Sequence, residues 1–245
     1  MTRHATETSQ RGAARIAGCA LLLIILSGVV GTLIGRDHMD VSGDAVATAR
    51  NILAHPTRFR IGTAFEIVMF NSDVVLAVAL YVLLKPVNPA LALLGAFWRL
   101  GNAIVLGVSV ALSLAALDLL GGAHYLKVFN ADQLQAQAKF FLDMHETGSL
   151  VGLVFFSLGA AVHSYLLIKS AYISRLLSGL YLFGAVWLLL CCFGFIIAPN
   201  SMTVFNTAFI VPDFVAELLV ALWLTCKGAK VPQPVDATER LEEVS

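Results

Sequence analysis

Six apolar segments, each about as long as a helix that crosses a bilayer, leave this chain little room for any other fold. A helix rises about 1.5 Å per residue, so it needs about 20 residues to cross the hydrocarbon core. The chain is 58% hydrophobic and 13% charged, against about 45–50% and about 25% in soluble domains. We therefore predict an all-α, polytopic six-helix transmembrane bundle. The expected spans are 14–35, 60–84, 91–119, 148–168, 175–197 and 210–226.

Two of the connections are long enough to form helices of their own. In "VSGDAVATARNILAHPTRF", Ser42 is placed to begin a short helix that ends at Pro56. In "NADQLQAQAKFFLDMHETG", Asn130 and Gln133 have the spacing of a capping box. Each segment carries an apolar stripe, so we predict two short amphipathic helices on the outer surface of the bundle.

The basic residues favour one orientation in the membrane. With the N-terminus inside, the cytoplasmic segments carry nine Lys and Arg residues and the opposite segments carry six. Basic residues are enriched on the cytoplasmic side, and an even number of spans puts both termini there. We predict a single transmembrane domain at 14–228, with disordered cytoplasmic segments at 1–13 and 229–245.

Charge and motifs exclude several classes of partner. The 16 basic and 16 acidic residues cancel, so there is no electrostatic reason to expect a nucleic acid partner. The four cysteines lie in or beside apolar runs without the spacing of a metal site. No H-x-x-x-H, E-x-x-H, C-x-x-C or P-loop pattern occurs. The sequence therefore indicates neither a metal nor a cofactor, and its expected surroundings are a lipid bilayer.

Ionisable residues lie inside the predicted spans. Each costs about 2.5–3.5 kcal/mol on insertion scales, so it normally faces the bundle interior or water. Glu66 and Asp73 are seven residues apart on one helix face, about 9 Å and about 20 Å below the outer end. Arg99 and Asn102 are three apart in the third span, with Arg99 at about the depth of Asp73. This spacing predicts an Asp73–Arg99 pair at the floor of a pocket.

Spans four and six supply further polar groups at their outer ends. Asp213 and Glu217 are four apart on one face, with Glu217 about 8–10 Å deep and level with Glu66. The segment "LDMHETG" brings His145 to the mouth of span four. We predict an outer-facing pocket whose rim is formed by Glu66, His145, Asp213 and Glu217. The predicted ligand-binding residues are Glu66, Asp73, Arg99, Asn102, His145, Asp213 and Glu217.

Several of these residues also have a structural explanation. Asp73 and Arg99 would fix helix register as an ion pair, and Arg99 could instead snorkel to the inner membrane edge. Asp213 follows a proline at a helix start, where it would cap the helix and complement its dipole. Glu66 and Glu217 have no such explanation, so they are the strongest candidates for a functional role, catalysis included.

Five stretches of the chain together resemble a known group of proteins. They are "ARIAGCALLLIILSGVVG", "NILAHPTRFRIG", "ALYVLLKPVNPALALLGAFWRLGNAIVLG", "FFSLGAAVHSYLLIKSAYISRLLSGL" and "VAELLVALWLTCKG". The chain resembles the bacterial membrane proteins grouped as domain-of-unknown-function family 4386, over nearly all of residues 14–228. The resemblance implies a multi-pass topology in a bacterial plasma membrane. The family has no assigned activity to carry over.

Three functions fit this pattern, and we predict the first. It is the binding or handling of a small apolar or lipid-like molecule in an outer-leaflet pocket, with intramembrane carboxylates as anchors. The second is a membrane-embedded acid–base enzyme acting on a hydrophobic, isoprenoid-like substrate, with Glu66 or Glu217 as the acid. The third is a structural or partner-binding protein whose buried charges only pair. Small residues at Gly28–Gly31 and Gly95–Gly101 would suit such helix contacts. Contacts of this kind could also join two copies of the chain in a homo-oligomer.

Overall fold

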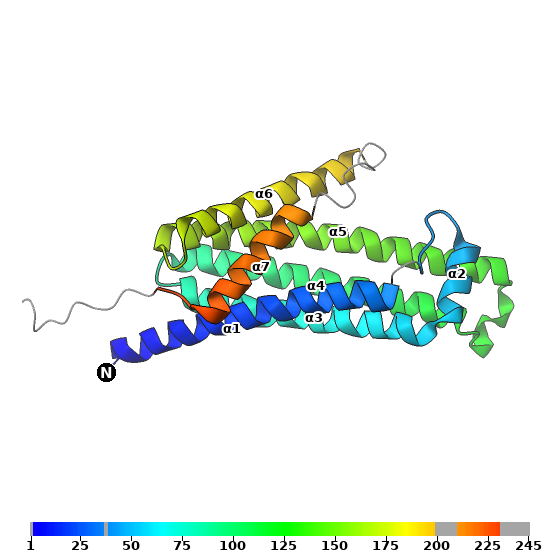
Figure 1. The fold of residues 1–245 in the computed structure, drawn as a ribbon. Coiled ribbons are helices and arrows are strands. Elements are labelled where there is room, and N and C mark those ends of the chain that lie inside the picture. Colours follow the sequence, from blue (N-terminus) through cyan, green and yellow to red (C-terminus); the bar gives the residue numbers. More distant parts are fainter. Residues whose placement is uncertain (1, 37–38, 199–209, 231–245) are drawn as a thin grey trace, which may run out of the picture.

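Helices account for all the regular structure in the ranges that the computed structural model describes, which are 2–36, 39–198 and 210–230 (Figure 1). The predicted all-α fold is therefore confirmed. A π-helix, η1 (Gly31–Arg36), continues the first helix, and η2 (His124–Val128) is a short 3₁₀-helix. The α-helices are α1 (Thr2–Val30), α2 (Ala45–Ala54), α3 (Pro56–Leu84), α4 (Pro89–Leu120), α5 (Ala131–Ser170), α6 (Arg175–Ile197) and α7 (Val211–Cys226).

Five of the described helices are long and apolar enough to cross a membrane. They are α1 with η1, α3, α4, α5 and α6. The sixth predicted span appears as α7, but its 16 residues rise only about 24 Å, less than the hydrocarbon core of about 30 Å. The bundle is confirmed, whereas the predicted count of six full-length spans is not matched.

The first of the two predicted surface helices is present as α2. Its N-cap is Asp44 rather than Ser42, because the helix begins at Ala45 and the Asp44 carboxylate accepts the N–H of Ala47 at 2.8 Å. Its buried face, which includes Ile52, covers Phe59 at the start of α3.

The second predicted surface helix is not a separate element. The Asn130–Gln133 capping box forms as predicted, but it begins α5, whose 40 residues rise about 60 Å without a break. Gly148 is tolerated inside the helix, and no proline interrupts it. The segment is therefore the projecting first part of a membrane-spanning helix.

The chain ends differ from expectation on one side. The segment predicted to be disordered, 1–13, is helical from Thr2 onward, because α1 begins there. Gln10 in this segment is buried and donates to the carbonyl of Leu83 at 3.1 Å. On the other side, all of the predicted disordered tail that follows Lys230 lies outside the described residues.

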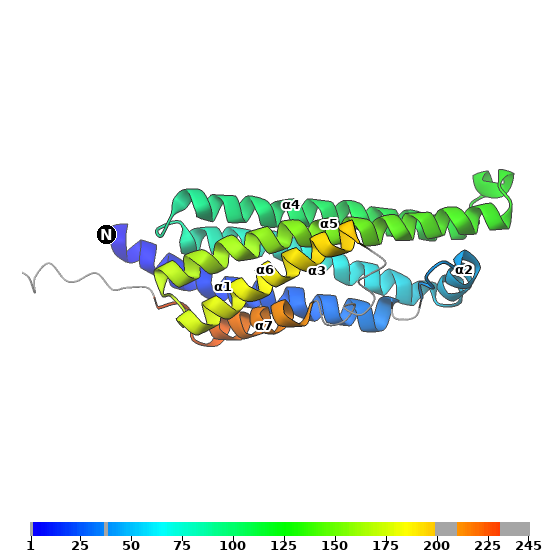
Figure 2. The same ribbon diagram turned by 90° about the horizontal axis from the view of Figure 1, so that it is seen from above.

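The five long helices and the shorter α7 form a ring in chain order (Figures 1 and 2). α1 packs on α3, and each following helix packs on its predecessor as far as α6. The short α7 crosses obliquely between α6 and α1, which closes the ring (Figure 1). Polar groups that are far apart in the sequence can therefore meet at the centre of the ring.

The two ends of the ring are packed differently. Toward the end where α1 begins, apolar side chains from all six helices of the ring fill the interior, among them Leu21, Leu80, Leu83, Leu167 and Leu224. Toward the α2 end a smaller apolar cluster lies under α2. Between these two clusters lies the cavity described below.

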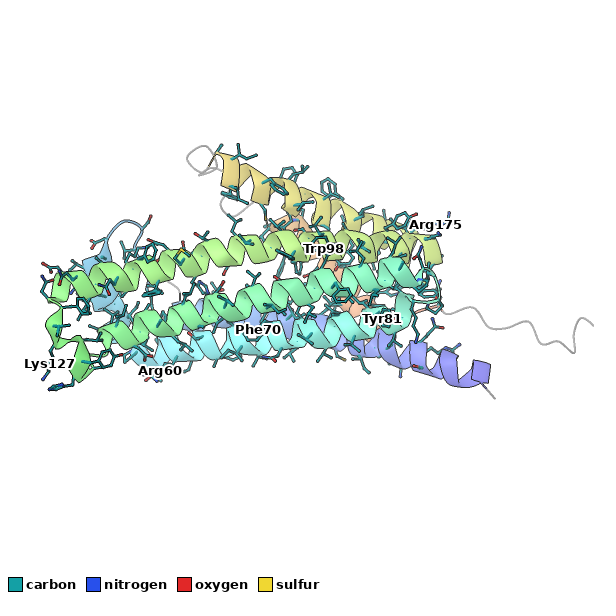
Figure 3. All side chains as sticks on the ribbon, turned by 180° about the vertical axis from the view of Figure 1, so that it is seen from behind. Arg60, Phe70, Tyr81, Trp98, Lys127 and Arg175 are labelled. Atoms are coloured by element: carbon teal, nitrogen blue, oxygen red, sulfur yellow. The ribbon has the colours of Figure 1, made fainter. Side chains whose placement is uncertain are left out.

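The outside of the bundle is apolar. Leu26, Val78, Ile104 and Phe183 are each about 60% exposed to solvent, as are many similar side chains along the spans. Soluble proteins rarely expose so continuous an apolar surface, whereas a bilayer would cover it. Charged side chains lie toward the ends, with Arg60 and Lys127 at one end and Arg175 at the other (Figure 3).

Candidate functional site

A cavity of about 630 Å³ lies inside the ring and is lined by residues from α1, α3, α4, α5, α6 and α7. Its volume falls within the range of about 300–1,000 Å³ that small-molecule sites occupy. The walls are mainly apolar. The apolar lining residues include Ile24, Val29, Met69, Phe70, Leu106, Val110, Leu153, Phe156, Leu188 and Phe214.

The floor of the cavity is a hydrogen-bonded network centred on Arg99. Its guanidinium donates from Nη1 to Asp73 Oδ1 at 2.8 Å and from Nη2 to Glu217 Oε1 at 3.0 Å. The same Nη2 lies 2.9 Å from the Tyr181 hydroxyl, which donates to Glu217 Oε1 at 3.3 Å. Asn102 Nδ2 donates to the second oxygen of Asp73 at 2.7 Å. Four helices, α3, α4, α6 and α7, are thereby joined at one point.

Arg99 is held on its apolar side as well. Its side chain is 0% exposed, and its Cζ lies 4.3 Å from the centroid of the Phe156 ring. A Cβ added at Gly159 would lie 3.3 Å from Arg99 Cγ, so α5 passes closely over the side chain. The predicted Asp73–Arg99 pair is therefore present, and burial of Arg99 rules out the snorkelling alternative.

Glu217 differs from the prediction in its depth. It was expected at the rim, level with Glu66, but it bonds to Arg99 at the floor. The depth estimate assumed that span six starts at the membrane surface, whereas α7 is short and crosses the ring obliquely (Figure 1). Tyr181 was missed altogether. The single signal for it was the one hydroxyl in the apolar stretch "GLYLFG".

The rim of the cavity contains a second polar pair. His145 Nε2 lies 3.2 Å from Glu66 Oε2, and both residues line the cavity. The pair joins α3 to α5, about two turns from the floor residue Asp73 on α3. The sequence predicted both residues for the rim, and the structure brings them into contact.

Asp213 also lines the cavity, but it is not the helix cap that its position suggested. The N-cap of α7 is Ile210, and Asp213 lies in the first turn, where its charge complements the helix dipole. The residue is 3% exposed, and its Oδ1 is buried without a hydrogen-bond partner among the described residues. No described residue therefore satisfies this acceptor, which belongs to a side chain in the cavity lining.

A close approach of two helices fixes the position of Asp213. A Cβ added at Gly184 of α6 would lie 2.7 Å from the Cα of Asp213, a contact with backbone that real structures do not show. We expect Gly184→Ala to destabilise the protein by about 1–3 kcal/mol, because α7 must move away from α6. Gly179→Ala is the control, since a Cβ there meets nothing within 4 Å. Thermal unfolding in detergent measures both, and equal stability of the two variants would contradict the close contact.

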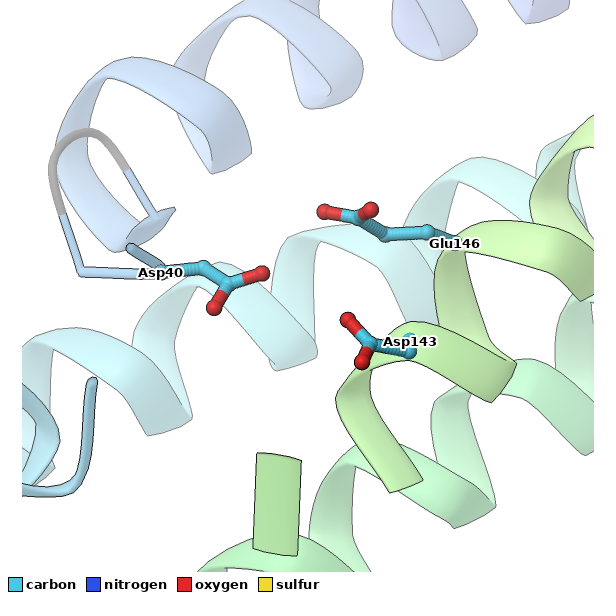
Figure 4. Close-up of side chains that lie close together, drawn as sticks. All are labelled: Asp40, Asp143 and Glu146. Carbon is cyan, nitrogen blue, oxygen red and sulfur yellow. The ribbon is translucent and has the colours of Figure 1, made fainter. Parts of the chain in front are cut away.

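A separate acidic group lies outside the cavity, near the α2 end. Asp40, Asp143 and Glu146 bring carboxylate oxygens within 4.8 Å of one another (Figure 4). Lys139 already bonds to two of these residues, with Asp40 3.1 Å from its Nζ and Asp143 closer still. Lys139 supplies the positive charge that these carboxylates need, so we interpret the group as a structural ion-pair cluster. It connects the segment before α2 to α5.

The fold and the site together define a multi-pass membrane protein, a helical ring with a central apolar cavity and a buried ionic floor. A family model matches residues 16–228, nearly the whole described bundle. The chain belongs to this family, described as a domain of unknown function (DUF4386). No curated protein and no solved structure gave a significant match.

Proposed function

We propose that this protein binds a small apolar or lipid-like molecule in its central cavity. The observation that carries the proposal is the cavity itself, about 630 Å³ with mainly apolar walls and a few converging polar groups. Small-molecule sites have this composition, because apolar walls supply affinity and a few polar groups fix orientation. The polar groups would be Asp213 and Glu217 at the floor and Glu66 at the rim.

The unequal packing of the ring supports binding from one side. The half toward the start of α1 is filled by leucines and alanines, which would block passage through the bundle in this conformation. We propose that the α2 end faces outward and that both termini lie in the cytoplasm of a bacterium, following the bias in basic residues. A lipid-like molecule would then enter from the outer leaflet of the plasma membrane.

Native mass spectrometry of protein released gently from membranes tests this proposal. We expect the wild type to carry a discrete bound mass. The amount bound to Glu66→Gln/Glu217→Gln should be at least about tenfold lower, since both polar anchors lose their charge. Asp118→Asn/Asp132→Asn is the matched control, because it removes two carboxylates that are exposed and outside the cavity. The control should retain the mass.

The bound mass also separates the outcomes. Equal bound mass in the wild type and in a folded Gln variant would contradict the proposal, as would a wild type that carries nothing. Size-exclusion chromatography of each variant shows whether it remains folded. If the Gln variant unfolds, the cavity-filling variant Gly28→Phe replaces it in this test, since Gly28→Phe leaves both carboxylates in place.

A second function, acid–base catalysis on a hydrophobic substrate, is favoured by one contact. Glu66 and His145 lie 3.2 Å apart in the cavity lining, a separation that suits proton transfer between them. An enzyme would give different bound masses in the two proteins, with product in the wild type and unconverted substrate in the Gln variant. A binding protein would give one mass that only changes in amount.

A further inference from the structure

Carboxylates outnumber cations around the floor of the cavity. Asp73 and Glu217 bond to Arg99 there, and Asp213 lies one turn before Glu217 on α7 and lines the same cavity. Arg99 is the one Lys or Arg side chain among the described residues that line the cavity or bond to its floor. Its guanidinium is already committed to Asp73 and Glu217. Uncompensated charge is costly away from water, so the surplus favours protons or a positively charged ligand.

The surplus is concentrated at Asp213. Asp73 accepts hydrogen bonds on both oxygens, and Glu217 accepts from Arg99 and Tyr181. Asp213 Oδ1, by contrast, is buried and has no hydrogen-bond partner within the part of the chain that the structure describes. A buried acceptor without a donor is unfavourable, and a ligand that supplies an N–H would correct this.

The rest of the cavity lining also suits a cation and disfavours an anion. Phe214 and Phe70 line the same cavity, and aromatic faces attract ammonium groups. A carboxylate or phosphate ligand would meet the surplus negative charge and would find Arg99 already paired. A neutral alcohol could donate one hydrogen bond but would leave the charge uncompensated.

We propose that the ligand is an amphiphile with a protonated amine, whose nitrogen donates to Asp213 while its apolar body fills the cavity. This inference rests on the proposed function and adds the chemical class of the ligand. Asp213 is the recognition residue, Arg99 fixes the other two carboxylates, and Gly184 keeps α7 close to α6 so that Asp213 faces the cavity.

Three probes of equal chain length test the inference on the full-length protein in nanodiscs of zwitterionic lipid. They are dodecylamine, dodecanol and dodecanoic acid, and native mass spectrometry measures the occupancy of each. We expect wild-type protein to bind dodecylamine at least about tenfold more tightly than dodecanol, and dodecanoic acid least. Asp213→Asn should reduce the preference for the amine to less than about twofold while dodecanol still binds. Asp118→Asn, an exposed control, should leave the preference unchanged.

The outcomes separate the inference from the function on which it rests. Equal binding of amine and alcohol by the wild type would overturn the amine class and leave the apolar-ligand function standing. The same holds for an amine preference that survives Asp213→Asn. If the wild type retains no probe and carries no mass from the membrane, the proposed function fails as well. Should Asp213→Asn not fold, the order of the three probes on the wild type still decides.

Discussion

Replacing Arg99 with methionine is expected to destabilise the bundle by about 3–5 kcal/mol, more than any other single substitution proposed for this chain. Methionine keeps an unbranched apolar side chain of similar length but removes the guanidinium, which also lies over the Phe156 ring, so the loss comes from the charged group. Without the guanidinium, Asp73 and Glu217 lose their shared partner in a buried site. Chemical unfolding in detergent micelles, followed by circular dichroism, measures the change.

An exposed arginine and a double variant make this test specific. Arg60→Met removes an exposed charge outside the network and should change stability by no more than about 0.5 kcal/mol. Asp73→Asn/Arg99→Met should recover part of the loss, with a coupling energy of about 1–3 kcal/mol between the two positions. Additive effects of the two substitutions would show that the buried pair contributes nothing as a pair.

The same cycle addresses the purely structural explanation of the buried charges. If the partly restored double variant still retains its bound molecule, Asp73 and Arg99 only hold the helices together. If it is stable but empty, the ionic floor also orients the ligand. The two readings of this pair therefore differ in ligand retention, which stability alone does not report.

Helical periodicity was enough to predict much of the floor. The depth of a residue can be estimated by counting about 1.5 Å per residue from the start of its helix, and prolines mark the starts of α3 and α4. This count places Asp73 and Arg99 at the same depth, which is why the pair could be predicted. The same count misplaced Glu217, because it cannot reveal that a helix is tilted or starts below the membrane surface. The count works for full-length spans and fails for the short α7.

Two other features had weak signals for a physical reason. A tyrosine in an apolar run is ordinary, since its ring packs well and its hydroxyl needs only one partner, so Tyr181 gave no sign of its position beside Arg99. The continuity of α5 was missed because a capping box marks where a helix starts, while only a breaker marks where it ends. Closure of the ring by α7 depends on packing between helices distant in sequence, which no local pattern encodes.

Filling the cavity without altering any charge is expected to have the largest effect on ligand binding of any single substitution. Gly28 of α1 lines the cavity, and a Cβ there would lie 3.5 Å from Met69 Sδ, an ordinary contact. The ring of Gly28→Phe can therefore enter the empty space without displacing the backbone. We expect at least about tenfold less bound molecule and a stability within about 1 kcal/mol of the wild type. Native mass spectrometry and thermal unfolding measure these two quantities.

Gly12→Phe is the matched control, since Gly12 lies on the same helix, outside this cavity, and a Cβ there meets nothing within 4 Å. It should keep the bound molecule. A stable Gly28→Phe that also keeps it would place the ligand elsewhere on the protein, even if Glu66→Gln/Glu217→Gln had lost it. Loss in both variants, one changed only in space and the other only in charge, requires that the molecule occupies the cavity and contacts its carboxylates.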